Sequence, residues 1–123
     1  MKTILAVDDS RTELRLVEAI LQQSGFRVVT VENGEDALTF VDREIPDLMV
    51  LDVVMPEMSG FDLCRQLRSR PNLDKIPIIF CTSKDQEFDR FWGLRQGGNA
   101  YITKPFAPHE LIEAVNECLD TRI

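Results

Sequence analysis

Short runs of apolar residues alternate along the chain with longer segments in which apolar residues recur every three or four positions. Short apolar runs are typical of buried strands, and the longer spacing is typical of amphipathic helices. The runs that fit strands are residues 3–7, 27–31, 48–51, 78–82 and 100–103. Each is followed by a segment with helical spacing. This alternation predicts an α/β fold with five parallel strands, five helices and right-handed crossovers.

Small polar residues, glycines and prolines mark the expected ends of the helices. Ser10 and Ser59 can cap the first and third helices, and Asn33-Gly34 is a turn into the second. Gly25 is expected to end the first helix. The fourth helix is expected at residues 86–96, and Pro108 suits the first turn of the last helix.

The strand at residues 48–51 contains no polar residue and ends directly before Asp52. An apolar run of this kind indicates a strand that is buried on both faces, as in the centre of a parallel sheet. Open α/β sheets place their ligands in the crevice outside the carboxyl ends of the strands. Asp52 is therefore the first candidate for chemistry.

Composition narrows the class of protein. With 123 residues, 44% of them hydrophobic, residues 1–123 are expected to form a single domain. The net charge of −7 and the lack of a run of Lys or Arg argue against nucleic acid or an anionic membrane as the main partner. The N-terminal apolar run ends at Asp8, which predicts no signal peptide or membrane segment and a cytoplasmic protein.

The three cysteines, Cys64, Cys81 and Cys118, are scattered, and the chain contains no CxxC motif. This pattern favours reduced, buried thiols over a disulfide framework or a metal site.

Polar residues lie at the carboxyl ends of four of the expected strands. They are Asp8 and Asp9, Asp52, Thr82, and Lys104. In a parallel sheet these ends lie along one edge, where carboxylates ~5 Å apart would repel by roughly 3 kcal/mol per pair at an effective dielectric constant of 20. Lys104 supplies one compensating charge. A hard divalent cation would supply the rest, and Mg²⁺ fits carboxylate oxygens and a phosphate best.

This arrangement matches the needs of phosphoryl transfer to a carboxylate. Lys104 and the metal would neutralise the phosphoryl oxygens while Asp52 attacks in line, and Thr82 could donate to a third oxygen. Each residue also has a purely structural interpretation, as a helix cap, a turn residue or a solvated lysine. Their convergence on one edge favours the functional interpretation.

The chain resembles the response-regulator receiver domains, the CheY-like modules of two-component signalling, over essentially its whole length. The motifs that carry this resemblance are Val7-Asp8-Asp9-Ser10, Leu51-Asp52-Val53-Val54-Met55-Pro56, Ser59-Gly60 and Tyr101-Ile102-Thr103-Lys104-Pro105-Phe106. The resemblance implies a flavodoxin-like, doubly wound (βα)5 sandwich of three layers with strand order 2-1-3-4-5. It also implies a cis bond between Lys104 and Pro105.

The resemblance also implies roles for individual residues. Mg²⁺ would be bound by Asp8, Asp9, Asp52 and the backbone carbonyl of Val54. Asp52 would accept a phosphoryl group from a histidine kinase or phosphotransfer domain, with Lys104 on the phosphoryl group. Thr82 and Tyr101 would form the switch pair.

Further expectations concern how such a chain would act. It would be no enzyme beyond promoting its own Mg²⁺-dependent phosphorylation and dephosphorylation. It would have no output domain and would be a monomer or weak dimer. A downstream protein would dock on the face formed by the fourth helix, the fifth strand and the last helix.

Some positions depart from the usual pattern of the family. Gly98 replaces a common alanine and is expected to loosen the end of the fourth helix. Lys84 and Val54 occupy positions that tune dephosphorylation, so the lifetime of the phosphoryl group is left open.

The expected fourth helix carries Phe88, Phe91 and Trp92. The segment resembles stand-alone receivers of the PilG and PilH type from type IV pilus, twitching and phototaxis systems. The aromatic side chains could pack in the core, or they could form a partly exposed docking surface.

Two other classes of protein are alternatives to this interpretation. A phosphatase of the haloacid-dehalogenase type needs an Asp-x-Asp pattern after the first strand, which Asp8-Asp9-Ser10 does not supply. A flavodoxin-like module would bind a flavin phosphate at that loop, where Asp8 and Asp9 would repel it. Within the receiver interpretation, a phosphoryl sink without output remains an alternative, and the sequence names neither the kinase nor the target.

Overall fold

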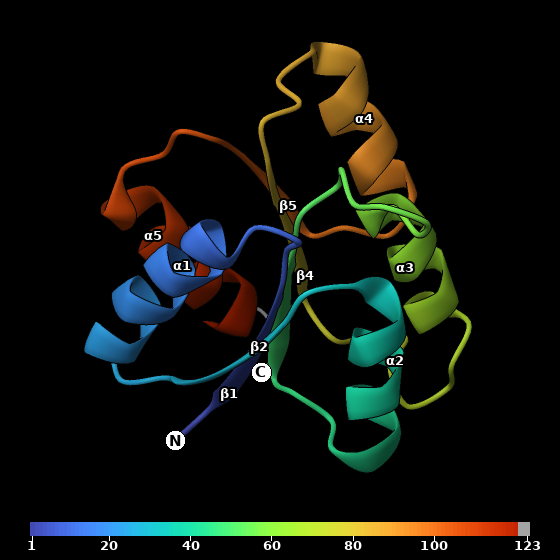
Figure 1. Cartoon of the computed structure of the whole chain (residues 1–123), viewed down its shortest axis with the longest axis horizontal. Helices are drawn as coiled ribbons and strands as arrows, with labels where there is room; N and C mark the ends of the chain where they lie inside the picture. Colours follow the sequence, from blue (N-terminus) through green and yellow to red (C-terminus); the bar gives the residue numbers. More distant parts are fainter. Residues whose placement is uncertain (121–123) are drawn as a thin grey trace.

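The computed structural model describes residues 1–120, which form a five-stranded parallel sheet with helices on both faces (Figure 1). The strands are β1 (Thr3–Val7), β2 (Arg27–Val31), β3 (Leu48–Leu51), β4 (Ile78–Thr82) and β5 (Ala100–Thr103). Their order in the sheet is β2-β1-β3-β4-β5, and every neighbouring pair is parallel. The predicted fold class and strand order are confirmed.

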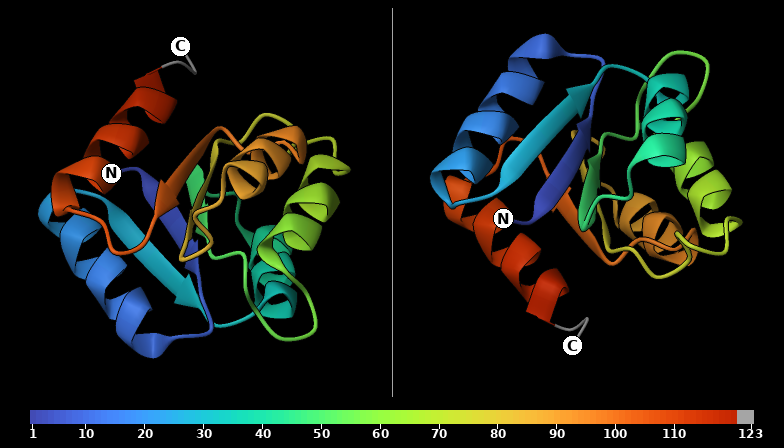
Figure 2. Two further views of the ribbon diagram at one scale, coloured as in Figure 1. Left: turned by 90° about the horizontal axis from the view of Figure 1, so that it is seen from above. Right: turned by 90° about the horizontal axis from the view of Figure 1, so that it is seen from below.

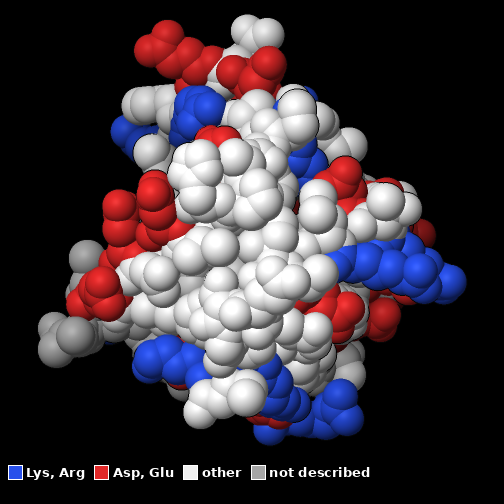
Figure 3. Space-filling view, turned by 90° about the vertical axis from the view of Figure 1, so that its left-hand side faces the viewer, with Lys and Arg blue, Asp and Glu red and all other residues white. Residues whose placement is uncertain are grey.

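Within the described residues, five helices alternate with the strands. They are α1 (Arg11–Gln23), α2 (Gly34–Arg43), α3 (Gly60–Arg68), α4 (Glu87–Arg95) and α5 (Pro108–Asp120). Figure 2 shows α1 and α5 on one face of the sheet and α2, α3 and α4 on the other. Figure 3 views the α1 and α5 side, where charged side chains lie around a broad uncharged area.

The polar residues at the predicted boundaries form the expected caps. The side chains of Ser10 and Asn33 accept hydrogen bonds from backbone N–H groups of the first turns of α1 and α2. Ser59 and Asp62 form a reciprocal capping box at the start of α3. Gly25, which follows α1, has a φ of +94°, a left-handed conformation that glycine adopts without strain.

The core consists of two apolar clusters, one on each face of the sheet. The central strand β3 contributes Leu48 and Val50 to one cluster and Met49 and Leu51 to the other. All four are buried. The strand is therefore covered on both faces, as its apolar sequence predicted.

The three cysteines are free and buried, as expected. Burial raises the pKa of the Cys64 thiol to about 11 and that of the Cys81 thiol to about 12. These thiols are therefore protonated, and unreactive, at neutral pH. Within residues 1–120, none of the helices combines the length and the apolar character needed to cross a membrane.

Candidate functional site

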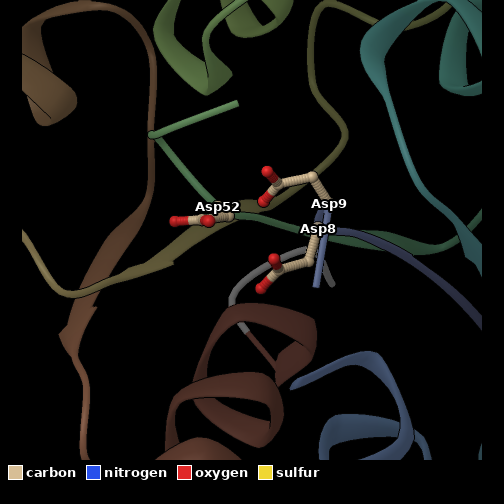
Figure 4. Close-up of side chains that lie close together, drawn as sticks. All are labelled: Asp8, Asp9 and Asp52. Atoms are coloured by element: carbon tan, nitrogen blue, oxygen red, sulfur yellow. The ribbon is translucent and has the colours of Figure 1, made fainter. Parts of the chain in front are cut away.

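The carboxylates of Asp8, Asp9 and Asp52 converge at the carboxyl edge of the sheet (Figure 4). Asp8 and Asp9 follow β1, and Asp52 follows the neighbouring β3, where its backbone N–H donates to the carbonyl of Val7 at 2.9 Å. One oxygen from each carboxylate lies within 4.8 Å of the other two. Asp8 and Asp52 are buried, whereas Asp9 is exposed.

Backbone groups orient these carboxylates. The N–H of Val53 donates to Asp52 Oδ1 at 2.8 Å, and the N–H of Ser10 donates to Asp8 Oδ1 at 2.9 Å. The turn after Asp52 depends on Gly60, because a Cβ there would overlap the carbonyl oxygen of Asp52. A glycine at the start of α3 thus lets the helix approach the acidic residue closely.

Lys104 provides the positive charge of the site. It follows β5, and its Nζ lies 2.6 Å from Asp8 Oδ2 and 4.0 Å from Asp52 Oδ2. Glu13, on α1, is 3.8 Å from the same nitrogen. The peptide bond between Lys104 and Pro105 is cis, as expected.

The site holds more negative than positive charge in a partly desolvated place. Burial raises the pKa of Asp52 above its usual range; the charge of Lys104 opposes this effect, and the charge of Asp8 adds to it. Burial lowers the pKa of Lys104, but its hydrogen bond to Asp8 and the charges of Asp52 and Asp8 outweigh burial, and its pKa is raised overall. An additional cation would relieve the imbalance.

The donor set fits a hard divalent cation. Octahedral coordination at about 2.1 Å places neighbouring oxygens about 3 Å apart and opposite ones about 4.2 Å apart. One oxygen each from Asp8, Asp9 and Asp52 already lies within 4.8 Å of the other two, close to these separations. The exposed position of Asp9 leaves one side open to water. That side faces a depression of about 510 Å³, lined in part by Asp9, Glu32 and Glu57.

Thr82 and Tyr101 lie on the adjacent strands β4 and β5 and are connected through the backbone of Lys84. Thr82 is fully buried, and its hydroxyl accepts from the N–H of Lys84 at 3.4 Å. The hydroxyl of Tyr101 donates to the carbonyl of the same Lys84 at 2.8 Å. Burial raises the pKa of Tyr101 to about 12, so this hydroxyl remains a donor at neutral pH.

Two residues around Tyr101 were not identified from the sequence. The Arg90 guanidinium lies 5.5 Å from the centre of the tyrosine ring and donates to Tyr101 O at 3.3 Å and Thr103 Oγ1 at 2.5 Å. A Cβ on Gly93 would lie 3.0 Å from Tyr101 Cδ2 and 3.2 Å from Phe61 Cε1, so the ring uses the space that glycine leaves. A glycine inside a helix was the available signal for Gly93; the sequence carried none for Arg90.

The aromatic residues of α4 are exposed, so the core-packing alternative is wrong. The exposed fractions are 70% for Phe88, 56% for Phe91 and 43% for Trp92. The structure also gives Gly98 a packing role, since a Cβ there would lie 2.5 Å from Phe80 Cε2.

The side chain of Val54 is 52% exposed. The predicted role of its backbone carbonyl as a metal ligand stays a prediction.

Comparison with known proteins agrees with this geometry. Residues 4–116 match the family model for the response regulator receiver domain. The chain is 42% identical over 119 residues to protein PilH of Pseudomonas aeruginosa, covering 97% of this chain and 98% of PilH. It is 42% identical over 118 residues to the transcriptional regulatory protein PhoP of Bacillus subtilis, covering 96% of this chain but 48% of PhoP. The chain thus spans about half the length of PhoP.

Among solved structures, the chemotaxis response regulator CheY4 of Vibrio cholerae superposes with a TM-score of 0.91 at 30% identity. The match covers 97% of this chain and 99% of CheY4. Sequence motifs, strand order and the acidic cluster at the sheet edge all agree with these matches. The chain belongs to the response regulator receiver domain family.

Proposed function

We propose that the chain is a phosphorylation-activated response regulator in which Asp52 accepts a phosphoryl group from a histidine kinase or phosphotransfer domain. The observation that carries this proposal is a buried Asp52 carboxylate with Asp8, Asp9 and Lys104 gathered around it. Carboxylates held this close repel one another, so a positive ligand bound between them would stabilise the cluster.

The proposed cofactor is Mg²⁺, held by Asp8, Asp9, Asp52 and the carbonyl of Val54. When bound, it would neutralise charge on the phosphoryl oxygens. Asp52 Oδ1 is held by the Val53 N–H, which leaves Oδ2, facing Lys104, as the attacking atom. A P–O bond forms at Oδ2 while the donor's P–N bond breaks and the histidine ring leaves as neutral imidazole after taking up a proton. Lys104 would then turn from Asp8 toward the phosphoryl group.

The proposed output is docking of a downstream protein on the face formed by α4, β5 and α5. Tyr101, which we propose as a switch residue, belongs to β5 and contacts Lys84 and Arg90. Similarity to PilH over nearly the full length supports a role in the control of type IV pili, in twitching or phototaxis. The chain would promote only its own phosphorylation and dephosphorylation. Water would be the co-reactant that removes the phosphoryl group from Asp52.

Acetyl phosphate with Mg²⁺ tests the phosphoryl acceptor. Mass spectrometry should find one added phosphoryl group, and hydroxylamine should remove it because it cleaves acyl phosphates. Asp52→Asn should abolish the modification, whereas Asp74→Asn, at an exposed loop position, should leave it unchanged. Asp9→Asn should slow it by weakening metal binding. A modification that resists hydroxylamine, or that persists in Asp52→Asn, would contradict the proposal.

A further inference from the structure

Helix α4 exposes an unusual amount of apolar surface for its length. Among residues 1–120, eight large apolar side chains are exposed, and four of them, Phe88, Phe91, Trp92 and Leu94, lie on this nine-residue helix. Its single buried residue is Gly93. In Figure 1 the helix projects at the top of the molecule, away from most of the other elements. Apolar surface gathered in this way marks an interaction site.

The three aromatic side chains form an ordered stripe along the helix together with Arg95. Phe88, Phe91, Trp92 and Arg95 have the spacing i, i+3, i+4 and i+7, so they share one face, here called the α4 outer stripe. The rings of Phe88 and Trp92 are stacked, with centroids 6.3 Å apart and planes at 6°. The guanidinium of Arg95 lies 5.5 Å from the centre of the Phe91 ring. Pairing within the stripe pre-orders it for binding.

Charges differ between the two ends of the same helix. Glu87 and Asp89 lie in the first turn and Arg95 in the last. Figure 3 shows acidic side chains at the top of the molecule, where α4 begins. An antiparallel second copy would place each acidic first turn beside the Arg95 of its partner and would align the helix dipoles favourably. A parallel copy would bring like charges together. The acidic residues and the net charge of −7 also make an anionic lipid surface a poor occupant.

We infer that the α4 outer stripe is a self-association surface, on which two copies of this chain pair through antiparallel α4 helices related by a two-fold axis. Such a contact is self-complementary, because the same stripe serves both partners. A nine-residue helix is about 13 Å long. It offers less than the roughly 800 Å² per partner of a standard interface. The dimer should therefore be weak, with a Kd between about 10 µM and 1 mM.

Sedimentation equilibrium of the unphosphorylated chain tests this inference independently of the role proposed for Asp52. The parent protein should show a monomer–dimer equilibrium in that concentration range. Phe88→Ser should weaken dimerisation by about tenfold or more, as expected for a central aromatic contact. Leu16→Ser, at a residue of α1 that is 47% exposed, is the matched control and should change nothing. Both sites are exposed, so circular dichroism should show intact folds.

A charge exchange tests the antiparallel geometry. Glu87→Arg and Arg95→Glu should each weaken dimerisation several-fold, and the double variant should restore it because opposite charges again face each other. A parent protein that stays monomeric up to about 1 mM would overturn the inference. The stripe would then be a binding surface for a different protein. Equal weakening by Leu16→Ser, or a double variant no better than the single ones, would overturn it as well.

Discussion

At the scale of single residues, the charges of the proposed acceptor site lower the stability of the folded state and favour its proposed chemistry. Asp52 lies beside Asp8, and burial raises the pKa of Asp52 while Lys104 only partly compensates. A group whose charged form is disfavoured in the folded state lowers the stability of that state at neutral pH. The same excess of negative charge attracts a cation to the site. A bound cation would then lie beside the Asp52 carboxylate, the proposed nucleophile.

We therefore predict that Asp52→Asn stabilises the chain at pH 7 in the presence of a chelator, by about 1 kcal/mol. Because the folded pKa of Asp52 is above the unfolded value, the native state holds its proton more tightly. The parent should lose stability as pH rises from about 4 through the raised pKa, and the difference from Asp52→Asn should shrink toward pH 4. Urea unfolding of both proteins across this pH range measures the difference in their free energies of unfolding. An Asn variant less stable than the parent at pH 7 would refute this account.

At the scale of elements, α4 shows where sequence analysis reaches its limit. Phe88, Phe91 and Trp92 have the spacing that an inward face would have, but the inward face is made by Gly93 with Tyr101 and Phe61 against it. Periodicity defines a face of a helix and does not say which way it points. The decisive contact is between a glycine and rings from two other elements, which no local pattern records.

Gly98, just after α4, provides a test of close packing. A Cβ there would meet the Phe80 ring at 2.5 and 2.8 Å, and Phe80 is fully buried. Gly98→Ala should lower the free energy of unfolding by about 1–3 kcal/mol, because the core must shift to admit the methyl group. Phe80→Leu combined with Gly98→Ala should lose less than the sum of the single changes. Chemical denaturation of the four proteins measures the coupling, and strict additivity would contradict it.

Arg68 joins the end of α3 to the segments around α4. Its guanidinium donates to the carbonyls of Gly97 and Ile76, at 2.7 and 2.6 Å, and to the side chain of Asn99 at 3.0 Å. Nε bonds Gly97 O as well, at 3.1 Å. These acceptors lie in two loops, one before β4 and one between α4 and β5. The planar guanidinium of Arg68 therefore connects both loops to α3.

We predict that Arg68→Lys destabilises the chain by about 2–3 kcal/mol, since an ammonium cannot reach these acceptors together and leaves part-buried carbonyls unsatisfied. Arg70→Lys is the matched control. Arg70 forms an exposed ion pair with Asp42, and its replacement should cost less than about 0.5 kcal/mol. Thermal unfolding of both variants measures the difference. Equal losses would mean that Arg68 acts only as a surface charge.

At the scale of the whole molecule, the sequence predicted the arrangement that topology determines. Alternating strands and helices imply a parallel sheet, and a parallel sheet brings Asp8, Asp52, Thr82 and Lys104 to one edge whatever the side chains do. What topology leaves free was not predictable. Lys104 pairs closely with Asp8 rather than with Asp52, which depends on side-chain conformations set by packing. The bridge through Lys84 likewise requires the folded loop.

That bridge suggests how an event at Asp52 reaches α4. Thr82 and Tyr101 both bond the backbone of Lys84, in the loop that leads into α4. If the Thr82 hydroxyl turns toward a phosphoryl oxygen, it releases the Lys84 N–H, the loop shifts, and the acceptor for Tyr101 moves with it. Tyr101 in turn packs on Gly93 of α4. A local hydrogen bond would then bias a two-state arrangement of the whole face.

Trp92, the single tryptophan, lies on α4 and can report this change. We predict that beryllofluoride with Mg²⁺, standing in for the phosphoryl group, alters Trp92 fluorescence in dilute protein. Thr82→Ala should reduce the change, because a lost hydrogen bond of about 1–1.5 kcal/mol shifts the equilibrium roughly tenfold. Thr82→Ser keeps the hydroxyl and should retain the signal. Stabilisation by Mg²⁺ alone should persist in Thr82→Ala, since no metal ligand is removed. A full fluorescence change in Thr82→Ala would refute the switch role of Thr82, and no change in the parent protein would refute the coupling of Asp52 to α4.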